Sequence, residues 1–124
     1  MGYSLSKRSR DNLIGVHPDL VRVVERAIQI SEVDFGVSEG LRTIERQRQL
    51  YEQGRSQTMN SYHLTGDAVD LFAWVDGGVS WAWDYYEDIA RAMNTAADEL
   101  GVQIVWGGTW RTLRDGPHFQ RVRV

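Results

Sequence analysis

Residues 61–70 read SYHLTGDAVD and run on into the apolar residues LFAW at 71–74. The segment AVDLFAW, residues 68–74, predicts a mostly buried strand, because it is short, apolar and rich in residues with high β-propensity. Gly66 lets the chain turn before this strand, so that the side chains of His63 and Asp70 can converge. A buried carboxylate without a partner is costly. We therefore expect Asp70 to face a cation, a metal ion or several hydrogen-bond donors.

A second histidine follows far along the chain, within DGPHF at residues 115–119. The sequence has no cysteine, so any metal ion must be held by histidine or acidic side chains. A catalytic zinc ion usually takes three protein ligands and leaves one position open for water. These observations predict a mononuclear zinc hydrolase site formed by His63, Asp70 and His118, with the backbone before His118 restricted by Pro117. The alternative for each histidine is an ordinary surface or hydrogen-bonded residue.

Asp115 is the carboxylate left over near this predicted site. A zinc hydrolase also needs an acidic residue that does not bind the metal and that passes a proton from water to the leaving amine. Asp115 fits this role if the turn before His118 directs its side chain toward the open position. An aspartate before Gly116 is also typical of an Asx turn, and the residues alone favour that interpretation.

Further residues are candidates for binding a substrate. Arg42 could clamp a carboxylate or be a solvated charge at the start of a helix, and the sequence leaves both possibilities open. Ser61 could donate a hydrogen bond to a carbonyl oxygen. Residues 54–66 show no periodicity, and a loop of this length is uncommon unless it is functional or disordered. We expect this loop to wall a cleft, together with Trp106 and Trp110.

Composition and charge restrict the class of protein. The chain has 124 residues, of which 42% are hydrophobic and 25% charged, and this fits one globular domain over residues 1–124. The net charge of −3 argues against a nucleic-acid-binding protein, although residues 111–124 include four arginines. No apolar run reaches the roughly 20 residues of a membrane span, and the N-terminus lacks the apolar segment of a signal peptide. Nothing in the sequence indicates more than a monomer.

The periodicity of apolar residues predicts an α+β fold, with helices packed on one antiparallel sheet. The predicted helices cover residues 18–31, 44–53 and 84–100, with weaker helical character at 4–14. The predicted extended segments are residues 33–40, 68–74, 102–106 and 118–122, with turns at 76–78 and 107–110.

Four motifs together resemble those of the zinc-dependent peptidoglycan peptidases. This family includes L-alanyl-D-glutamate endopeptidases, among them small bacteriophage endolysins, and D-alanyl-D-alanine carboxypeptidases. The motifs are S-x-H-x-x-G-x-A-x-D at 61–70, W-G-G-x-W at 106–110, D-x-P-H-F at 115–119 and SEGLRTIERQ at 38–47. The last one departs from the family pattern S-G-Y-R-S-x-x-x-Q at residues 39–41, but Arg42 and Gln47 stand in the matching places. The resemblance covers about residues 33–120.

The resemblance implies a small central antiparallel sheet with flanking helices. It also implies that His63, Asp70 and His118 are the zinc ligands and that Asp115 is the general base and then the general acid. Arg42 matches an arginine near the substrate carbonyl or carboxylate. Ser61 matches a polar residue on the substrate side.

The tryptophan and histidine motifs are closer to the endopeptidase branch of the family. We therefore expect hydrolysis of the L-alanyl-D-glutamate bond of the peptidoglycan stem peptide by a phage endolysin of a Gram-negative host. Such an enzyme is made in the host cytoplasm and reaches the periplasm when a holin opens the membrane. The alternatives are a D-alanyl-D-alanine carboxypeptidase with the same metal centre, or a non-catalytic zinc-stabilised wall-binding module. The acidic net charge departs from the basic character often seen in these endolysins and disfavours a nucleic-acid module.

Overall fold

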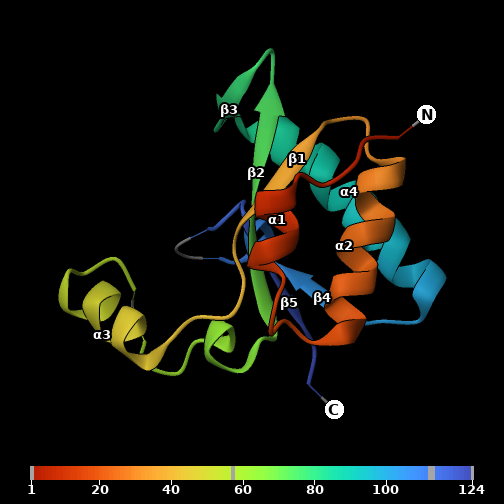
Figure 1. Ribbon diagram of the computed structural model, residues 1–124. Coiled ribbons are helices and arrows are strands. Elements are labelled where there is room, and N and C mark those ends of the chain that lie inside the picture. The colour runs from red at the N-terminus through yellow and green to blue at the C-terminus, as the bar shows by residue number, and fades with distance from the viewer. Residues whose placement is uncertain (1, 57, 112–113, 124) are drawn as a thin grey trace.

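The computed structural model describes residues 2–56, 58–111 and 114–123 (Figure 1). Gln57, within the predicted loop, lies outside the described residues. The helices are α1 (Lys7–Asn12), α2 (Pro18–Ile30), α3 (Ile44–Glu52) and α4 (Trp83–Leu100), with short 3-10 helices η1 (Tyr62–Thr65) and η2 (Gly107–Thr109). The strands are β1 (Phe35–Glu39), β2 (Ala68–Val75), β3 (Gly78–Ser80), β4 (Ile104–Trp106) and β5 (His118–Arg121). The predicted α+β class is confirmed.

The described strands form one antiparallel sheet organised around β2. Strand β1 lies along one edge of β2, while the other edge pairs with β5 near the start of β2 and with β3 near its end. Strand β4 pairs with β5, so the order across the sheet is β1-β2-β5-β4. Side chains of β2 alternate between the two faces of the sheet. Val69, Leu71 and Ala73 are buried on one face, and the opposite face carries Ala68, which is also buried, and then Asp70, Phe72 and Trp74.

Helices α2 and α4 pack against each other and form the core with the sheet (Figure 1). Apolar residues three and four positions apart place one face of each helix in the interior. The fully buried side chains include Leu20, Val23, Val24 and Ala27 of α2 and Ile89, Met93 and Ala96 of α4. Pro18 opens α2, and Gly101 ends α4 with a φ of 70°, as the sequence predicts.

Three segments are more regular than the sequence indicates. Residues 76–78 are predicted only as a turn, but Asp76 and Gly77 have φ values of 53° and 79°, which suits a two-residue hairpin connection. The chain therefore folds back onto β2 as β3. The predicted loop 54–66 contains η1, which begins after a cap from Ser61. The predicted turn at 107–110 contains η2.

Helix α3 stands to one side of the sheet, away from the α2 and α4 layer (Figure 1). Thr43 caps its start by accepting a hydrogen bond from the Arg46 N–H, and Gly54 follows its end with a φ of 72°. Within the described part of the chain, no helix combines the length and the apolar character needed to cross a membrane.

Candidate metal centre and substrate cleft

Asp70 and His118 lie directly opposite each other in the antiparallel pair β2–β5. Residues in this relation place their side chains on the same face of the sheet, about 5 Å apart at Cβ. The distance from His118 Nδ1 to Asp70 Oδ1 is 3.3 Å. The Pro117 carbonyl accepts a hydrogen bond from the Leu71 N–H at 2.9 Å, which fixes the backbone just before His118. Strand register therefore joins two residues that are far apart in the sequence.

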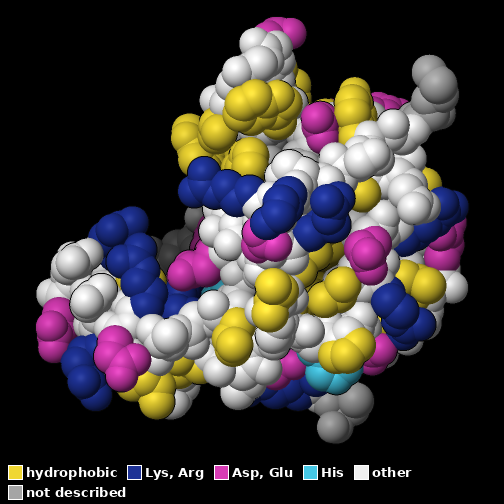
Figure 2. All heavy atoms as spheres, viewed as in Figure 1, with side chains coloured by type: hydrophobic (Ala, Val, Ile, Leu, Met, Phe, Trp, Pro, Cys, Tyr) yellow, Lys and Arg dark blue, Asp and Glu magenta, His cyan; other side chains and the backbone are white. Residues whose placement is uncertain are grey.

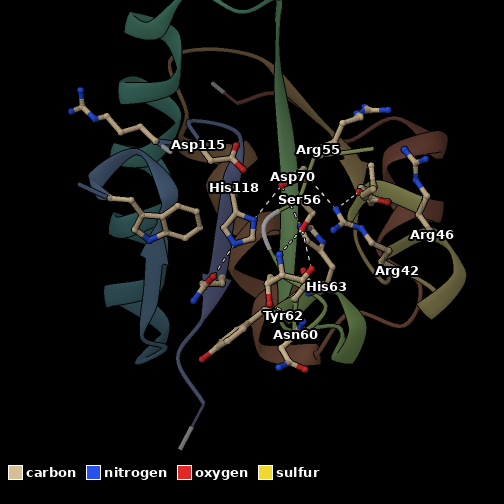
Figure 3. Close-up of a pocket in the computed structure, with 18 residues that line it drawn as sticks. Arg42, Arg46, Arg55, Ser56, Asn60, Tyr62, His63, Asp70, Asp115 and His118 are labelled. Atoms are coloured by element: carbon tan, nitrogen blue, oxygen red, sulfur yellow. Dashed lines mark hydrogen bonds and ion pairs between the residues drawn. The ribbon is translucent and has the colours of Figure 1, made fainter. Parts of the chain in front are cut away.

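His63 is buried in η1, immediately before β2. Ser61 Oγ accepts a hydrogen bond from the His63 N–H at 3.2 Å and so starts this short helix. Gly66 ends the helix with a φ of 75°, and a Cβ at this position would lie 2.4 Å from the Gly15 carbonyl oxygen. The turn thus requires glycine. It brings His63 Nε2 to 3.4 Å from Asp70 Oδ1 (Figure 3).

Each imidazole has one nitrogen held by a protein acceptor and the other nitrogen facing Asp70. His63 Nδ1 lies 2.9 Å from the Gly40 carbonyl oxygen, and His118 Nε2 lies 2.8 Å from Gln120 Oε1. Donation of an N–H at these two nitrogens leaves lone pairs on His63 Nε2 and His118 Nδ1. Metal-binding histidines are commonly oriented in this way by an outer carbonyl or amide.

The convergence of these acceptors suits a metal ion. Ligand atoms of His63, Asp70 and His118 lie within 4.8 Å of one another. Asp70 Oδ1 is buried and has no hydrogen-bond partner among the described residues, which is costly for a carboxylate oxygen unless a cation binds it. Two imidazoles and one carboxylate suit zinc and similar divalent metals. The group could therefore bind a metal ion.

Electrostatics at the site also favour a cation. Burial would raise the pKa of Asp70, but His118 and His63 outweigh burial and hold this pKa well below its usual range. Burial lowers the pKa of His118, but the Asp70 carboxylate outweighs it and raises that pKa overall. A carboxylate that stays ionised between two imidazoles attracts positive charge, whether a proton or a metal ion.

Asp115 lies half-buried in the loop before β5, with its carboxylate in the same pocket (Figure 3). Its carbonyl accepts a hydrogen bond from the His118 N–H at 3.2 Å, which closes a backbone turn over residues 115–118. Burial and the nearby Asp70 carboxylate raise the pKa of Asp115. A Cβ at Gly107 would lie 2.5 Å from the Asp115 carbonyl oxygen. Glycine at this position therefore lets the Asp115 turn approach the site.

Arg42 is not a solvated charge, since its side chain is only 9% exposed. Its guanidinium forms an ion pair with Glu39, lies 3.7 Å from Asp70 Oδ2 and donates a hydrogen bond to Gln47 Oε1 at 2.7 Å. The backbone N–H of Arg42 donates to the His63 carbonyl at 2.9 Å. Arg42 Nε has no hydrogen-bond partner among the described residues. The guanidinium is therefore fixed at the pocket wall with part of its donor capacity unused.

A cleft of about 670 Å³ opens at this site. That volume is within the usual range of ligand-binding clefts. The predicted wall is confirmed, since the cleft is lined by Gly54, Arg55, Ser56, Thr58, Asn60, Ser61 and Tyr62. Trp110 also lines it. Trp106 instead packs against Phe119 and donates its indole N–H to the Gly116 carbonyl at 2.7 Å, so its expected place in the cleft wall is wrong.

Several residues of the site carry no clear signal in the sequence. Arg46, Arg55 and Arg114 line the cleft, and within the described residues none of them forms an ion pair. Arg46 and Arg55 resemble solvated surface charges, because their sequence neighbours are polar or small. Arg114 instead donates to the Gly108 carbonyl at 3.2 Å and lies over the Trp83 ring. Gln120 could have been found, since it lies two positions after His118 on a strand and must share its face. Gln47 entered only through the family resemblance, yet it is fully buried and donates to the Thr58 carbonyl.

Known proteins are similar to this chain in sequence and in fold. The family model of the phage L-alanyl-D-glutamate peptidases matches residues 1–121. The L-alanyl-D-glutamate peptidase of Escherichia phage T5 is 30% identical over 119 residues, which cover 93% of this chain and 87% of that protein. The peptidoglycan L-alanyl-D-glutamate endopeptidase CwlK of Bacillus subtilis (strain 168) is 30% identical over 107 residues, or 73% of this chain and 62% of CwlK. The crystal structure of Serratia marcescens L-Ala D-Glu endopeptidase ChiX matches with a TM-score of 0.90 and 57% identity, over 94% of this chain and 87% of ChiX. The resemblance is confirmed, and the chain belongs to the phage L-alanyl-D-glutamate peptidase family.

Proposed function

We propose that this protein is a zinc-dependent peptidoglycan endopeptidase that hydrolyses the L-alanyl-D-glutamate bond of the stem peptide. The proposal depends above all on the convergence of His63, Asp70 and His118 in the cleft, with Asp115 beside them. Membership of the peptidase family supports the choice of bond.

His63, Asp70 and His118 would hold the zinc ion through Nε2, a carboxylate oxygen and Nδ1, respectively. Gly40 and Gln120 keep both imidazoles in the required orientation and tautomer. The chemistry that bound Zn²⁺ supplies is Lewis-acid polarisation of the scissile carbonyl and a lower pKa for water.

Asp115 acts as the proton carrier. Its carboxylate accepts a proton from the attacking water and then gives this proton to the D-glutamate nitrogen as the peptide bond breaks. Burial and the Asp70 charge raise the pKa of Asp115, which makes the carboxylate a better base for the first transfer. Arg42, held by Glu39 and Gln47, donates toward the oxygen of the scissile carbonyl, where negative charge develops.

The charge of the cleft suits this substrate. D-Glutamate forms one amide with L-alanine and another with the next residue, which leaves one free carboxylate. Arg46, Arg55 and Arg114 line the cleft and give it positive charge that can pair with such a group. Ser61 lies at the cleft wall, where it serves as a polar residue on the substrate side as well as a cap for η1.

Mass spectrometry of purified sacculi digested with the zinc-loaded protein tests the proposal. We expect fragments with a new N-terminal D-glutamate, and none after chelation. Release of D-alanine instead would identify a carboxypeptidase. Retention on sacculi without any soluble product would identify a wall-binding module.

The cellular role follows from the same proposal. We infer a phage endolysin whose residues 1–124 act as one monomeric catalytic domain on peptidoglycan in the periplasm, after a holin opens the membrane. Co-expression with and without a holin in a Gram-negative host tests this role, and lysis should require both proteins. Size-exclusion chromatography with light scattering tests the monomer.

A further inference from the structure

The face of β2 that carries Asp70 continues into large apolar side chains that the core does not use. Phe72 is half-buried, and Trp74 is 43% exposed. Trp74 pairs directly with Val79 of β3, which is 49% exposed. We call Phe72, Trp74 and Val79 the aromatic stripe. Figure 2 shows hydrophobic side chains gathered over the β2–β3 hairpin, next to the hollow beside α3.

The aromatic stripe is continuous with the candidate metal site. Residues two apart on one strand face the same way and lie about 7 Å apart, which places Phe72 about 7 Å and Trp74 about 13 Å from Asp70 along β2. The Phe72 ring packs over Gly36 of β1, since a Cβ at Gly36 would be 2.3 Å from the Phe72 Cζ atom. Gly36 thus leaves room for a ring in the surface of the sheet. Contiguous exposed apolar side chains beside a cleft, unlike single scattered ones, are typical of binding grooves.

The chemistry of the proposed substrate indicates which group lies next to the aromatic stripe. This inference therefore rests on the proposed function. In peptidoglycan the L-alanine nitrogen is joined through a lactyl group to a sugar of the glycan strand. One residue spans at most about 3.6 Å, so the sugar lies within roughly 10 Å of the scissile carbonyl. A glycan strand must therefore cross the protein next to the cleft whenever the peptide is bound.

We propose that the aromatic stripe binds the glycan strand, with sugar rings stacked on Trp74 and beside Val79. Pyranose rings present flat C–H faces, and the electron-rich face of an indole attracts them. A stripe that runs outward from the site along the β2–β3 hairpin also suits a linear polymer. An anionic membrane is a poorer occupant, because the protein has a net charge of −3 and Asp76 lies in the turn of this hairpin.

Indole N–H signals in NMR spectra test this binding without requiring catalysis. The probe is soluble glycan freed of peptides by an amidase, added to the protein. We expect a saturable shift of the Trp74 signal, which is assigned by its loss in Trp74→Ala. That variant should bind the glycan about three- to tenfold more weakly, and Trp74→Phe should bind nearly as well as the wild type. Tyr3→Ala is the matched control, since Tyr3 is also 43% exposed but lies beside α2, and its binding should be unchanged.

Cleavage assays separate this inference from the proposed function. Trp74→Ala should lose about three- to tenfold in kcat/KM on glycan-linked stem peptide and nothing on the same peptide without sugar. Equal glycan binding by Trp74→Ala and the wild type, or no saturable shift of Trp74, would overturn the glycan surface even if both peptides are cleaved. A Trp74 shift with phospholipid vesicles but not with glycan would also overturn it. Failure of the proposed function instead appears as glycan binding without cleavage of either peptide.

Discussion

Replacing Asp67 by asparagine should strongly destabilise the protein, although Asp67 lies outside the candidate metal site. The Asp67 side chain is only 6% exposed. Its Oδ1 accepts hydrogen bonds from Arg121 at 2.9 and 3.1 Å, and its Oδ2 accepts from Arg123 at 3.0 Å and from Thr65 at 2.6 Å. These contacts join the segment between η1 and β2 to the end of β5. They therefore hold His63 and His118 on one rigid unit.

The size of the effect follows from burial. Removing one partner of a buried ion pair costs about 3–5 kcal/mol. The Arg121 side chain is 16% exposed and the Arg123 side chain is 43% exposed, and exposed ion pairs contribute little. We therefore assign the effect mainly to Arg121 and expect a loss of about 2–4 kcal/mol. At about 4 °C per kcal/mol for a domain of this size, Tm should fall by roughly 8–16 °C.

The pH dependence gives the sharper test. Burial raises the pKa of Asp67, but the bonds from Thr65, Arg123 and Arg121 outweigh it and lower this pKa overall. A lowered folded-state pKa stabilises the protein above the unfolded-state value of about 3.9, and this contribution is lost as pH falls through the folded-state pKa.

Urea unfolding of the wild type and Asp67→Asn at pH 6.5 and pH 3 measures this effect. The difference in unfolding free energy should shrink at the lower pH. Asp88→Asn is the control, since Asp88 pairs with the exposed Arg91 and should hardly affect stability. A wild-type advantage that is absent at pH 6.5, or equally large at pH 3, would refute the ion-pair reasoning.

Three further predictions concern the site. Asp115→Asn should lose about 10²- to 10⁴-fold in kcat and keep its metal. In the metal-free wild type, carbon NMR should show that the pKa of Asp115 lies above the usual aspartate range, and metal loading should lower that pKa. Full activity in Asp115→Asn would remove Asp115 from the mechanism. Gly107→Ala should lower both Tm and activity, because its Cβ would lie 2.5 Å from the Asp115 carbonyl oxygen, whereas Gly78→Ala has open space and should preserve activity. Amidation of the D-glutamate carboxylate in the peptide should raise KM several-fold in the wild type and much less in Arg114→Gln. Equal KM values of the wild type for the amidated and the free peptide would contradict a role for the arginines in binding that carboxylate.

The sequence predicts the helices and the central strand well, because their apolar spacing is local information. Helix α4 begins at Trp83, one residue before the expected start, and both β2 and α3 begin where expected. The short strand β3 escapes prediction, because three residues carry too little periodicity, although the Asp76-Gly77 pair is a typical hairpin signal.

The residues of the candidate site also divide into those that the sequence predicts and those that it does not. His63, Asp70 and His118 were predicted as neighbours from residue chemistry and motif, and the structure places them together; that they bind zinc stays a prediction. The partners of Arg42 were not predictable in the same way. Glu39 reaches Arg42 through a strand irregularity next to Asp70, and Gln47 reaches it from the first turns of α3. Both partners lie within five positions of Arg42, but the spacing alone does not show that a strand irregularity and a helix start turn these three side chains together.

The position of β5 in the sheet has a consequence for how the site forms. This strand follows β2 and β4 in the sequence but lies between them, and it carries His118. The candidate metal site is therefore incomplete until β5 has paired with β2. Any local opening that releases β5 also separates His118 from Asp70 and should release the metal ion. Metal loading should in turn slow hydrogen exchange at the amides of β2 and β5 together, so that metal occupancy reports on the pairing of these two strands.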